Sequence, residues 1–256
     1  MTKELDISQI YERNELLWGA EAQKKLFKKH VVIAGLGGVG SYTADALARS
    51  GIGKLTLVDF DTVSETNINR QLLALISDIG KPKTELMKRR IENINPHIQV
   101  TEINEYYTLS LNNRIFAEKV DFVADAIDTL KFKIDLVETC YKQEIPIISS
   151  MGAGNRLDPE ELFIADISEI KPGNCSFVKN VKHKLKKRGI EKNLTVVSSH
   201  EKPIPTKKKL GTFEIKTADG EEIQVRKFTP GSSPFVPPAA GYMMASFIVR
   251  NLINTF

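Results

Sequence analysis

Residues 30–40 decide the fold, and they read His30-Val31-Val32-Ile33-Ala34-Gly35-Leu36-Gly37-Gly38-Val39-Gly40. The apolar run predicts a buried strand, which is followed by a glycine-rich turn and a helix over residues 41–50. Gly35, Gly37, Gly38 and Gly40 let the backbone turn tightly and approach a phosphate without a Cβ in the way. The start of the helix offers free N–H groups and the positive end of the helix dipole. This stretch therefore predicts a site for a nucleotide phosphate.

The next strand along the chain ends in an acid. Residues 55–59 form a second predicted buried strand, and Asp59 lies 19 residues after Gly40. An acid at this position can bind ribose hydroxyls. Asp61 is a further candidate nucleotide contact, although its position is equally typical of an acid that starts a loop. Many dinucleotide-binding domains share these features, so the features alone do not select a cofactor.

Strands and helices alternate through the first 150 residues. The further elements expected there are helices over 8–29, 83–95, 109–118 and 130–142, and strands over 98–103, 120–127 and 146–150. This alternation predicts an α/β fold with a doubly wound, largely parallel Rossmann-like sheet and helices on both faces. Residues 1–150 are therefore expected to form the nucleotide-binding core.

Residues 151–256 follow a different pattern and are expected to form a C-terminal extension packed on the same core. The expected elements are a basic helix over 178–188, an exposed loop over 200–211, a hairpin over 212–228 that turns at Ala218-Asp219-Gly220, and an apolar helix over 239–253.

Composition limits the cellular compartment and the kinds of metal site to be expected. The chain has 256 residues, 41% of them hydrophobic, which suffices for one large core. Its two cysteines form no CxxC pair, so neither a disulfide framework nor a structural zinc site is expected. Residues 1–10 lack an apolar run, and no stretch reaches the roughly 20 apolar residues of a membrane span. A cytoplasmic protein without a membrane segment is predicted. Cys140 is expected in the core, and a catalytic role for Cys175 stays open.

Positive charge is concentrated in the second part of the chain. Residues 151–256 hold 17 Lys/Arg and 11 Asp/Glu, and residues 171–192 hold eight Lys/Arg and one acid, Glu191. Such asymmetry indicates an anionic partner, with a solvated lysine-rich helix as the alternative.

Three further features indicate chemistry at a phosphate. They are Asn67-Ile68-Asn69-Arg70-Gln71 after the second strand, Lys83 at the start of a helix, and Asp125-Ala126-Ile127-Asp128 at the end of a later strand. Cations placed beyond the glycine loop suit nucleotidyl transfer, whose transition state gathers negative charge at the α-phosphate. A hydride-transfer enzyme has no need for them, which argues against an NAD-dependent oxidoreductase. A carboxylate at the end of a parallel strand, such as Asp128, is well placed to hold Mg²⁺ across phosphates.

In this combination and order, the motifs resemble the ubiquitin-activating-enzyme-like adenylating superfamily. The resemblance implies that Asp59 binds ribose, that Asn67, Arg70 and Lys83 contact the phosphates of ATP, and that Asp128 holds Mg²⁺. It also implies a homodimer in which Arg13, from the N-terminal helix, reaches the nucleotide of the neighbouring subunit. The catalytic set implied is thus Arg13, Arg70, Lys83 and Asp128.

The second part of the chain adds its own motifs. They are Met151-Gly152-Ala153-Gly154-Asn155-Arg156-Leu157-Asp158-Pro159, Leu185-Lys186-Lys187-Arg188, and Phe235-Val236-Pro237-Pro238-Ala239-Ala240-Gly241. They resemble the tRNA threonylcarbamoyladenosine dehydratase branch of the superfamily. That branch implies ATP-dependent adenylation of a carboxylate on tRNA, followed by attack of the neighbouring carbamoyl group. Lys182, Lys186, Lys187 and Arg188 are the phosphate contacts expected for tRNA.

Other functions remain open on the sequence alone. A related enzyme would adenylate the C-terminus of a ubiquitin-like or sulfur-carrier protein. A nucleotide-dependent binding module would bind ATP without turnover. A monovalent cation and a sulfur-transfer protein partner also stay open.

Overall fold

The computed structural model describes residues 7–171, 175–206, 209–216 and 222–254. Seven strands form one sheet in the order β3-β2-β1-β4-β5-β7-β6. They are β1 His30–Ala34, β2 Lys54–Val58, β3 Gln99–Ile103, β4 Phe122–Asp125, β5 Ile147–Ser150, β6 Leu162–Asp166 and β7 Thr195–Ser199. All neighbouring pairs are parallel except β6 and β7. The predicted fold class is confirmed.

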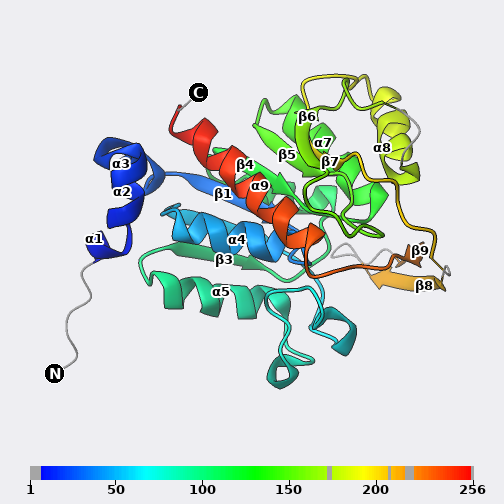
Figure 1. Cartoon of the computed structure of the whole chain (residues 1–256), viewed down its shortest axis with the longest axis horizontal. Helices are drawn as coiled ribbons and strands as arrows, with labels where there is room; N and C mark the ends of the chain where they lie inside the picture. Colours follow the sequence, from blue (N-terminus) through cyan, green and yellow to red (C-terminus); the bar gives the residue numbers. More distant parts are fainter. Residues whose placement is uncertain (1–6, 172–174, 207–208, 217–221, 255–256) are drawn as a thin grey trace.

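Helices cover both faces of the sheet (Figure 1). One face carries α4 Gly40–Arg49, α5 Lys83–Ile94 and α9 Val236–Leu252, and the other carries α6 Asn112–Ile115, α7 Leu130–Lys142 and α8 Ser176–Lys186. The two-residue period of β1 explains this division. Val31 and Ile33 pack into the cluster with α4, α5 and α9, whereas Val32 and Ala34 pack against α6 and α7.

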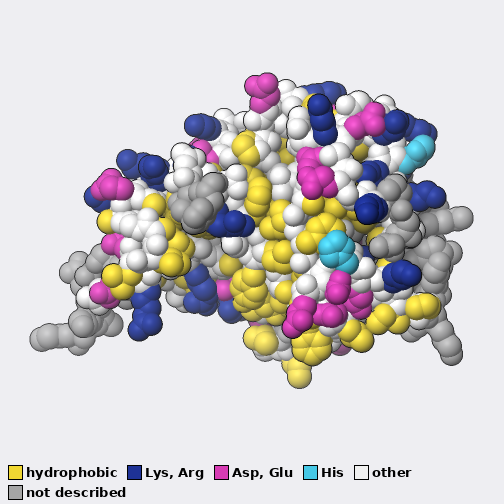
Figure 2. Space-filling view, turned by 45° about the horizontal axis from the view of Figure 1, so that its top comes forward, with side chains coloured by type: hydrophobic (Ala, Val, Ile, Leu, Met, Phe, Trp, Pro, Cys, Tyr) yellow, Lys and Arg dark blue, Asp and Glu magenta, His cyan; other side chains and the backbone are white. Residues whose placement is uncertain are grey.

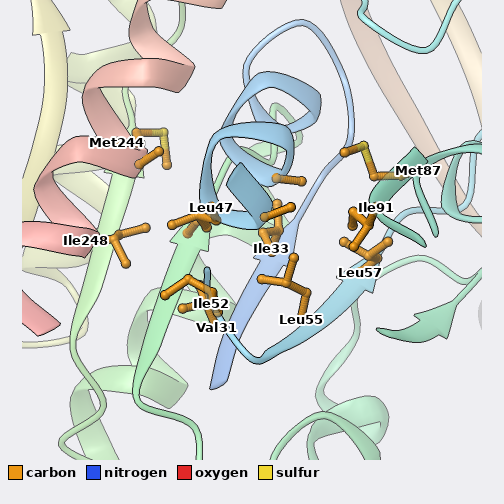
Figure 3. Packing of buried hydrophobic residues seen from close by; sticks show 14 of the residues in the cluster. Val31, Ile33, Leu47, Ile52, Leu55, Leu57, Met87, Ile91, Met244 and Ile248 are labelled. Atoms are coloured by element: carbon orange, nitrogen blue, oxygen red, sulfur yellow. The ribbon is translucent and has the colours of Figure 1, made fainter. Parts of the chain in front are cut away.

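The larger core joins the two parts of the chain. Figure 3 shows Val31 and Ile33 of β1, Leu47 of α4 and Ile248 of α9 pointing toward one another. All four are 0% exposed, and burial of each such side chain stabilises the fold by about 1.5–3 kcal/mol. Sheet and core therefore continue across residue 150, while the division into residues 1–150 and 151–256 stays a prediction.

The N-terminal helix expected over residues 8–29 is wrong as a single element. The structure has three short helices, α1 Ile7–Ile10, α2 Glu12–Trp18 and α3 Ala20–Leu26. The chain breaks at Gly19, whose φ of +88° is left-handed backbone that a helix cannot continue through. The helix expected over residues 109–118 is also shorter, because a 3₁₀ turn, η3 Leu109–Leu111, precedes the four residues of α6.

Predictions for the second part of the chain were incomplete. No strand was expected where β6 and β7 lie, although both complete the main sheet. The expected hairpin is confirmed as β8 Lys209–Lys216 paired with β9 Glu222–Thr229, and its turn, residues 217–221, lies outside the described residues. Residues 209–211 of the expected loop belong to β8, whereas 200–206 are irregular. Within the described ranges, no helix is both long and apolar enough to cross a bilayer.

Candidate active site

The glycine loop between β1 and α4 has two kinds of glycine. A Cβ on Gly35, whose φ is +91°, would lie 2.9 Å from the Ala126 carbonyl oxygen. A Cβ on Gly40 would collide with the Gly35 carbonyl oxygen. These two residues therefore shape the loop and pack it against the turn after β4. Gly37, by contrast, has only the Gln71 side-chain amide within 4 Å of a would-be Cβ, so the loop stays open there.

Asp59 connects the end of β2 to this loop. Its Oδ2 accepts the backbone N–H of Leu36 at 2.5 Å, and its Oδ1 accepts the N–H of Asp61 at 2.8 Å. The side chain is buried, and burial raises the pKa of the carboxyl group above its usual range. The acid predicted to bind ribose thus also holds the first turn of the glycine loop in place.

Lys83 and Asp61 form an ion pair beside Asp59. The Lys83 Nζ lies 2.8 Å from the Asp61 Oδ2, and the lysine side chain is 3% exposed whereas the aspartate is 45% exposed. Lys83 is the first residue of α5, where the helix dipole disfavours a cation. Asp61 offsets this cost and fixes the ammonium group near Asp59 and the glycine loop. The structure thus shows a contact for Asp61 that the sequence did not predict.

The segment 64–71 presents Arg70. Its Nη1 donates to the Thr66 carbonyl at 2.7 Å and to the Asn69 Oδ1 at 2.9 Å. Burial lowers the pKa of Arg70, and the negative charge of Asp128 opposes that shift. The two side chains are therefore close enough to attract one another. Asn67 has a structural position, because its Oδ1 accepts the Ser64 N–H at 3.2 Å in a capping box around η1 Glu65–Asn67.

Asp128 lies exposed just after β4, at the carboxyl end of the sheet. Among the residues that the structure describes, no three His, Cys, Asp or Glu side chains gather into a metal-binding group. One carboxylate next to a phosphate loop nevertheless fits Mg²⁺, which is usually held by one or two carboxylates together with substrate phosphates and water. The donor set therefore suits Mg²⁺ carried by a nucleotide rather than a metal caged by the protein.

Arg13 is remote from this site. It lies on α2, and its neighbour Asn14 donates to the Arg49 carbonyl, 2.8 Å away, at the C-terminal end of α4. The glycine loop lies at the opposite end of that helix, and ten helical residues span about 15 Å. Figure 1 shows α1–α3 as a cluster at the left, at the side where β1 begins.

Most of the basic residues predicted for tRNA have partners within the chain. Lys182 donates to the Ile170 carbonyl at 2.6 Å, Lys186 pairs with Glu191 at 3.1 Å, and Arg188 pairs with Asp135 at 3.6 Å and also with Glu138. Lys187, at the end of α8, is exposed and makes no salt bridge to any described residue. Figure 2 shows Lys and Arg side chains on the upper right of the surface, over α8.

Sequence reasoning missed two side chains near the loop. Gln71 is buried, and its Oε1 has no hydrogen-bond partner among the described residues. Tyr106 stacks on Phe60, and burial together with the charges of Asp61, Asp59 and Asp128 raises its pKa. Gln71 belongs to the motif quoted from the sequence, but no role was assigned to it, whereas the only signal for Tyr106 was its position after β3.

The two cysteines differ. Cys140 is fully buried, as expected, and burial raises the pKa of its thiol. Cys175 is half-buried and occupies the N-cap of α8 without a side-chain capping bond. It is remote from the glycine loop, because α8 packs over β7, and two strands, β4 and β5, lie between β7 and β1.

Comparisons with known proteins agree with this geometry. The chain is 44% identical over 248 residues to the tRNA threonylcarbamoyladenosine dehydratase of Bacillus subtilis (strain 168), and the match covers 95% of this chain and 94% of that protein. Two crystal structures of the Escherichia coli tRNA N6-threonylcarbamoyladenosine dehydratase TcdA are similar in fold. The complex with AMP matches with a TM-score of 0.84 at 29% identity, covering 98% of both chains. The complex with ATP matches with a TM-score of 0.82 at 28% identity, covering 96% of this chain and 95% of that one.

The model of the ThiF family matches residues 11–248. That range begins at Tyr11 of the N-terminal cluster, includes the glycine loop and the segment of Arg70 and Lys83, and ends inside α9. The chain therefore belongs to the ThiF family.

Proposed function

We propose that this protein is an ATP-dependent tRNA threonylcarbamoyladenosine dehydratase that works by forming an acyl-adenylate. One observation carries the adenylation step. Arg70 interacts electrostatically with Asp128 and lies beside Gly38 of the glycine loop, and Lys83 interacts with Asp59, which holds the same loop. The substrate class rests on the 44% identity to the Bacillus subtilis enzyme, which extends over 95% of the chain.

In the first step, a carboxylate oxygen of threonylcarbamoyladenosine attacks the α-phosphorus of ATP and pyrophosphate leaves. Arg70 and Lys83 stabilise the negative charge that builds up at the phosphate, because both cations are fixed before the reaction. Asp128 would hold Mg²⁺, which neutralises phosphate charge when it is bound. Asp59 would bind the ribose while keeping the loop in place.

In the second step, the carbamoyl group of the same substrate attacks the activated carbonyl carbon and AMP leaves. The product is a ring that contains one water fewer than the substrate. Nucleophile and electrophile belong to one molecule, so the protein does not have to supply their proximity. The mechanism requires no protein thiol, which agrees with the burial of Cys140 and with the position of Cys175.

We also propose a homodimer in which Arg13 acts on the neighbouring subunit. Arg13 cannot reach its own site across the length of α4. The helix that carries Arg13, α2, exposes two large apolar side chains, Leu16 at 83% and Leu17 at 79%. A second copy of the chain could cover them. An active monomer in light scattering at assay concentrations would contradict this proposal.

The anionic partner is tRNA, bound in part by α8. Of the predicted contacts, Lys187 remains a candidate for binding phosphate. We add Lys179 and Lys184, because both are exposed on α8. Lys182, Lys186 and Arg188 would have to exchange their internal partners for phosphates. The proposed compartment is the cytoplasm, where the tRNA substrate is found.

The test is mass spectrometry of nucleosides from tRNA incubated with the protein and ATP. The expected product is lighter than threonylcarbamoyladenosine by one water, with one AMP released for each ring formed. ATP–pyrophosphate exchange that requires a carrier protein instead of tRNA would favour the carrier-activating alternative. ATP binding without pyrophosphate release, with either substrate, would favour a binding module.

A further inference from the structure

Three polar side chains lie fully buried beneath the turn that carries Asp128. Lys133 of α7, Asp125 at the end of β4 and Ser149 of β5 are each 0% exposed. The Lys133 Nζ lies 2.6 Å from the Asp125 Oδ2 and donates to the Ser149 Oγ at 3.0 Å. The Ser149 hydroxyl donates to the same Asp125 oxygen at 2.6 Å. The adenylation chemistry described above uses none of these three groups.

Stability is a weak explanation for this cluster. Removing two charges from water costs several kcal/mol for each ion, and a buried pair can often be replaced by apolar residues without loss of stability. The surroundings would accept such a replacement, because Phe132, Leu136 and Val137 of α7 are all buried in apolar clusters. A buried pair in such a place is best explained by the conformation that it fixes.

The contact of the second Asp125 oxygen indicates that the cluster fixes the turn between β4 and α7. The Asp125 Oδ1 accepts the backbone N–H of Ile127 at 3.0 Å, and Ile127 immediately precedes Asp128. From the other side, the Ala126 N–H donates to the Ala34 carbonyl at 2.8 Å, just before the glycine loop. The turn is thus held between β1 and the buried carboxylate, and α7 begins two residues after Asp128.

We propose that the cluster of Lys133, Asp125 and Ser149 positions the carboxylate of Asp128 for the divalent cation. Lys133 holds the Asp125 carboxylate in place, and that carboxylate in turn holds the Ile127 amide and so the turn. These are positioning residues, because none of them touches nucleotide or metal. The inference rests on the proposed magnesium role of Asp128.

A matched control exists at the opposite end of β4. There Lys29 pairs with Asp121 at 2.9 Å, and the second oxygen of that aspartate accepts the His30 N–H at 3.0 Å. Both sites therefore consist of a lysine, an aspartate and a backbone amide, and only one lies at the nucleotide edge. Lys133→Met and Lys29→Met remove the lysine of each pair, although Lys29 is 28% exposed whereas Lys133 is 0% exposed.

Two measurements on the full chain test the positioning. The first is hydrogen–deuterium exchange of the Ile127 amide without nucleotide. The second is Mn²⁺ affinity by electron paramagnetic resonance with a non-hydrolysable ATP analogue present. Lys133→Met should speed the exchange and weaken Mn²⁺ binding by about tenfold each, which corresponds to losing one net hydrogen bond to a charged group. Ser149→Ala should act in the same direction with a smaller effect, and Lys29→Met should change neither quantity.

A double variant separates positioning from simple stability. Lys133→Met combined with Asp125→Leu removes the buried charges together, so the melting temperature should recover relative to Lys133→Met alone. Mn²⁺ affinity should stay low, because leucine at position 125 offers the Ile127 amide no acceptor. Recovery of Mn²⁺ affinity along with stability would overturn the proposal, as would wild-type exchange at Ile127 in Lys133→Met.

Asp128→Asn keeps the two hypotheses distinguishable. If this variant binds Mn²⁺ as tightly as wild type, the magnesium role in the proposed function is wrong. Exchange at Ile127 would then still decide whether the buried cluster fixes the turn. If Asp128→Asn loses Mn²⁺ while Lys133→Met keeps it, the proposed function stands and the positioning inference fails.

Discussion

The two edges of the sheet contain similar residues and differ in how their charges are balanced. At the amino edge, Lys29 pairs with Asp121 and Lys54 pairs with the largely exposed Glu118. At the carboxyl edge, Asp59 is held by backbone N–H groups, and Arg70 donates to oxygens of its own segment. Ion pairs occur at both edges, because Lys83 pairs with Asp61 and Lys133 with Asp125 at the carboxyl edge. Only the carboxyl edge has Asp59 and Arg70, which backbone groups fix beside the glycine loop.

The amino edge also has a hollow. A cavity of about 670 Å³ opens there, lined by residues that include Phe27, His97 and Gln99. None of the nucleotide motifs reaches it, because all of them follow the carboxyl ends of strands. Volume alone therefore does not locate the chemistry of this molecule, and the fixed, converging charges do.

The largest effect should come from the cations of the carboxyl edge. Arg70→Ala and Lys83→Ala should each slow adenylation by about 10²–10³, because a preorganised charge is lost at a developing anion. ATP–pyrophosphate exchange measures this rate, and Lys54→Ala at the amino edge is the control that should leave it unchanged.

The kinetic constants decide whether the difference between the edges is catalytic. A loss confined to the Michaelis constant for ATP would mean that Arg70 and Lys83 bind the ground state as strongly as the transition state. The carboxyl edge would then differ from the amino edge in its affinity for ATP and not in stabilising the transition state.

A second prediction asks whether the functional surface extends from the carboxyl edge to α8. Alanine at Lys179, Lys184 and Lys187 together should flatten the salt dependence of tRNA binding by up to about three phosphate contacts. That loss amounts to tens-fold in affinity at low salt, while ATP affinity stays unchanged. Filter binding at several salt concentrations provides the measurement.

The matched triple variant carries alanine at Lys182, Lys186 and Arg188, which have internal partners. It should change the salt slope less and should lower the melting temperature. Equal slopes for wild type and both triple variants would remove α8 from the tRNA surface and leave the adenylating edge intact.

The smallest effect concerns the amino edge and involves folding rather than activity. His30 is buried, with its ring nitrogens 3.1 Å from the Lys119 carbonyl oxygen and 2.8 Å from the Thr56 Oγ1. Burial lowers its pKa, so the unfolded chain takes up the proton first as pH falls below about 6.5. Stability present above that pH is therefore lost on acidification, by at most about 1.4 kcal/mol per pH unit for one proton.

Urea unfolding of wild type and His30→Gln between pH 7 and pH 5 measures this loss. The variant should show a shallower decrease in the free energy of unfolding. Parallel pH profiles for the two proteins would show that the proton is taken up elsewhere. His30 would then not cause the loss of stability on acidification.

Local motifs made the nucleotide edge predictable. The glycine loop, Asp59 and Asp128 each lie at or just after the end of a predicted strand, so strand prediction alone places them at one edge. Contacts between distant segments were not predictable in this way. Lys133 meets Ser149 across 16 residues and Arg188 meets Glu138 across 50, and no periodicity encodes either pairing.

The misses have identifiable physical causes. The apolar spacing through Leu17 and Leu26 fits one long helix, and Gly19 overrides it by adopting left-handed backbone. The strands β6 and β7 are each five residues long and stand among polar and basic stretches, so their length gave little signal. Net charge on α8 indicated an anionic partner, but it could not show that several of its cations were already paired.

The contact between α4 and α9 sets an order of events during synthesis. The Thr43 Oγ1 donates to the Gly241 carbonyl, 3.1 Å away across 198 positions of the chain. At about 5–20 residues per second, a ribosome makes the glycine loop and α4 some 10–40 s before the helix that covers them. Throughout that interval the apolar face of α4 lacks its partner, so the nascent chain needs protection from aggregation until α9 has emerged.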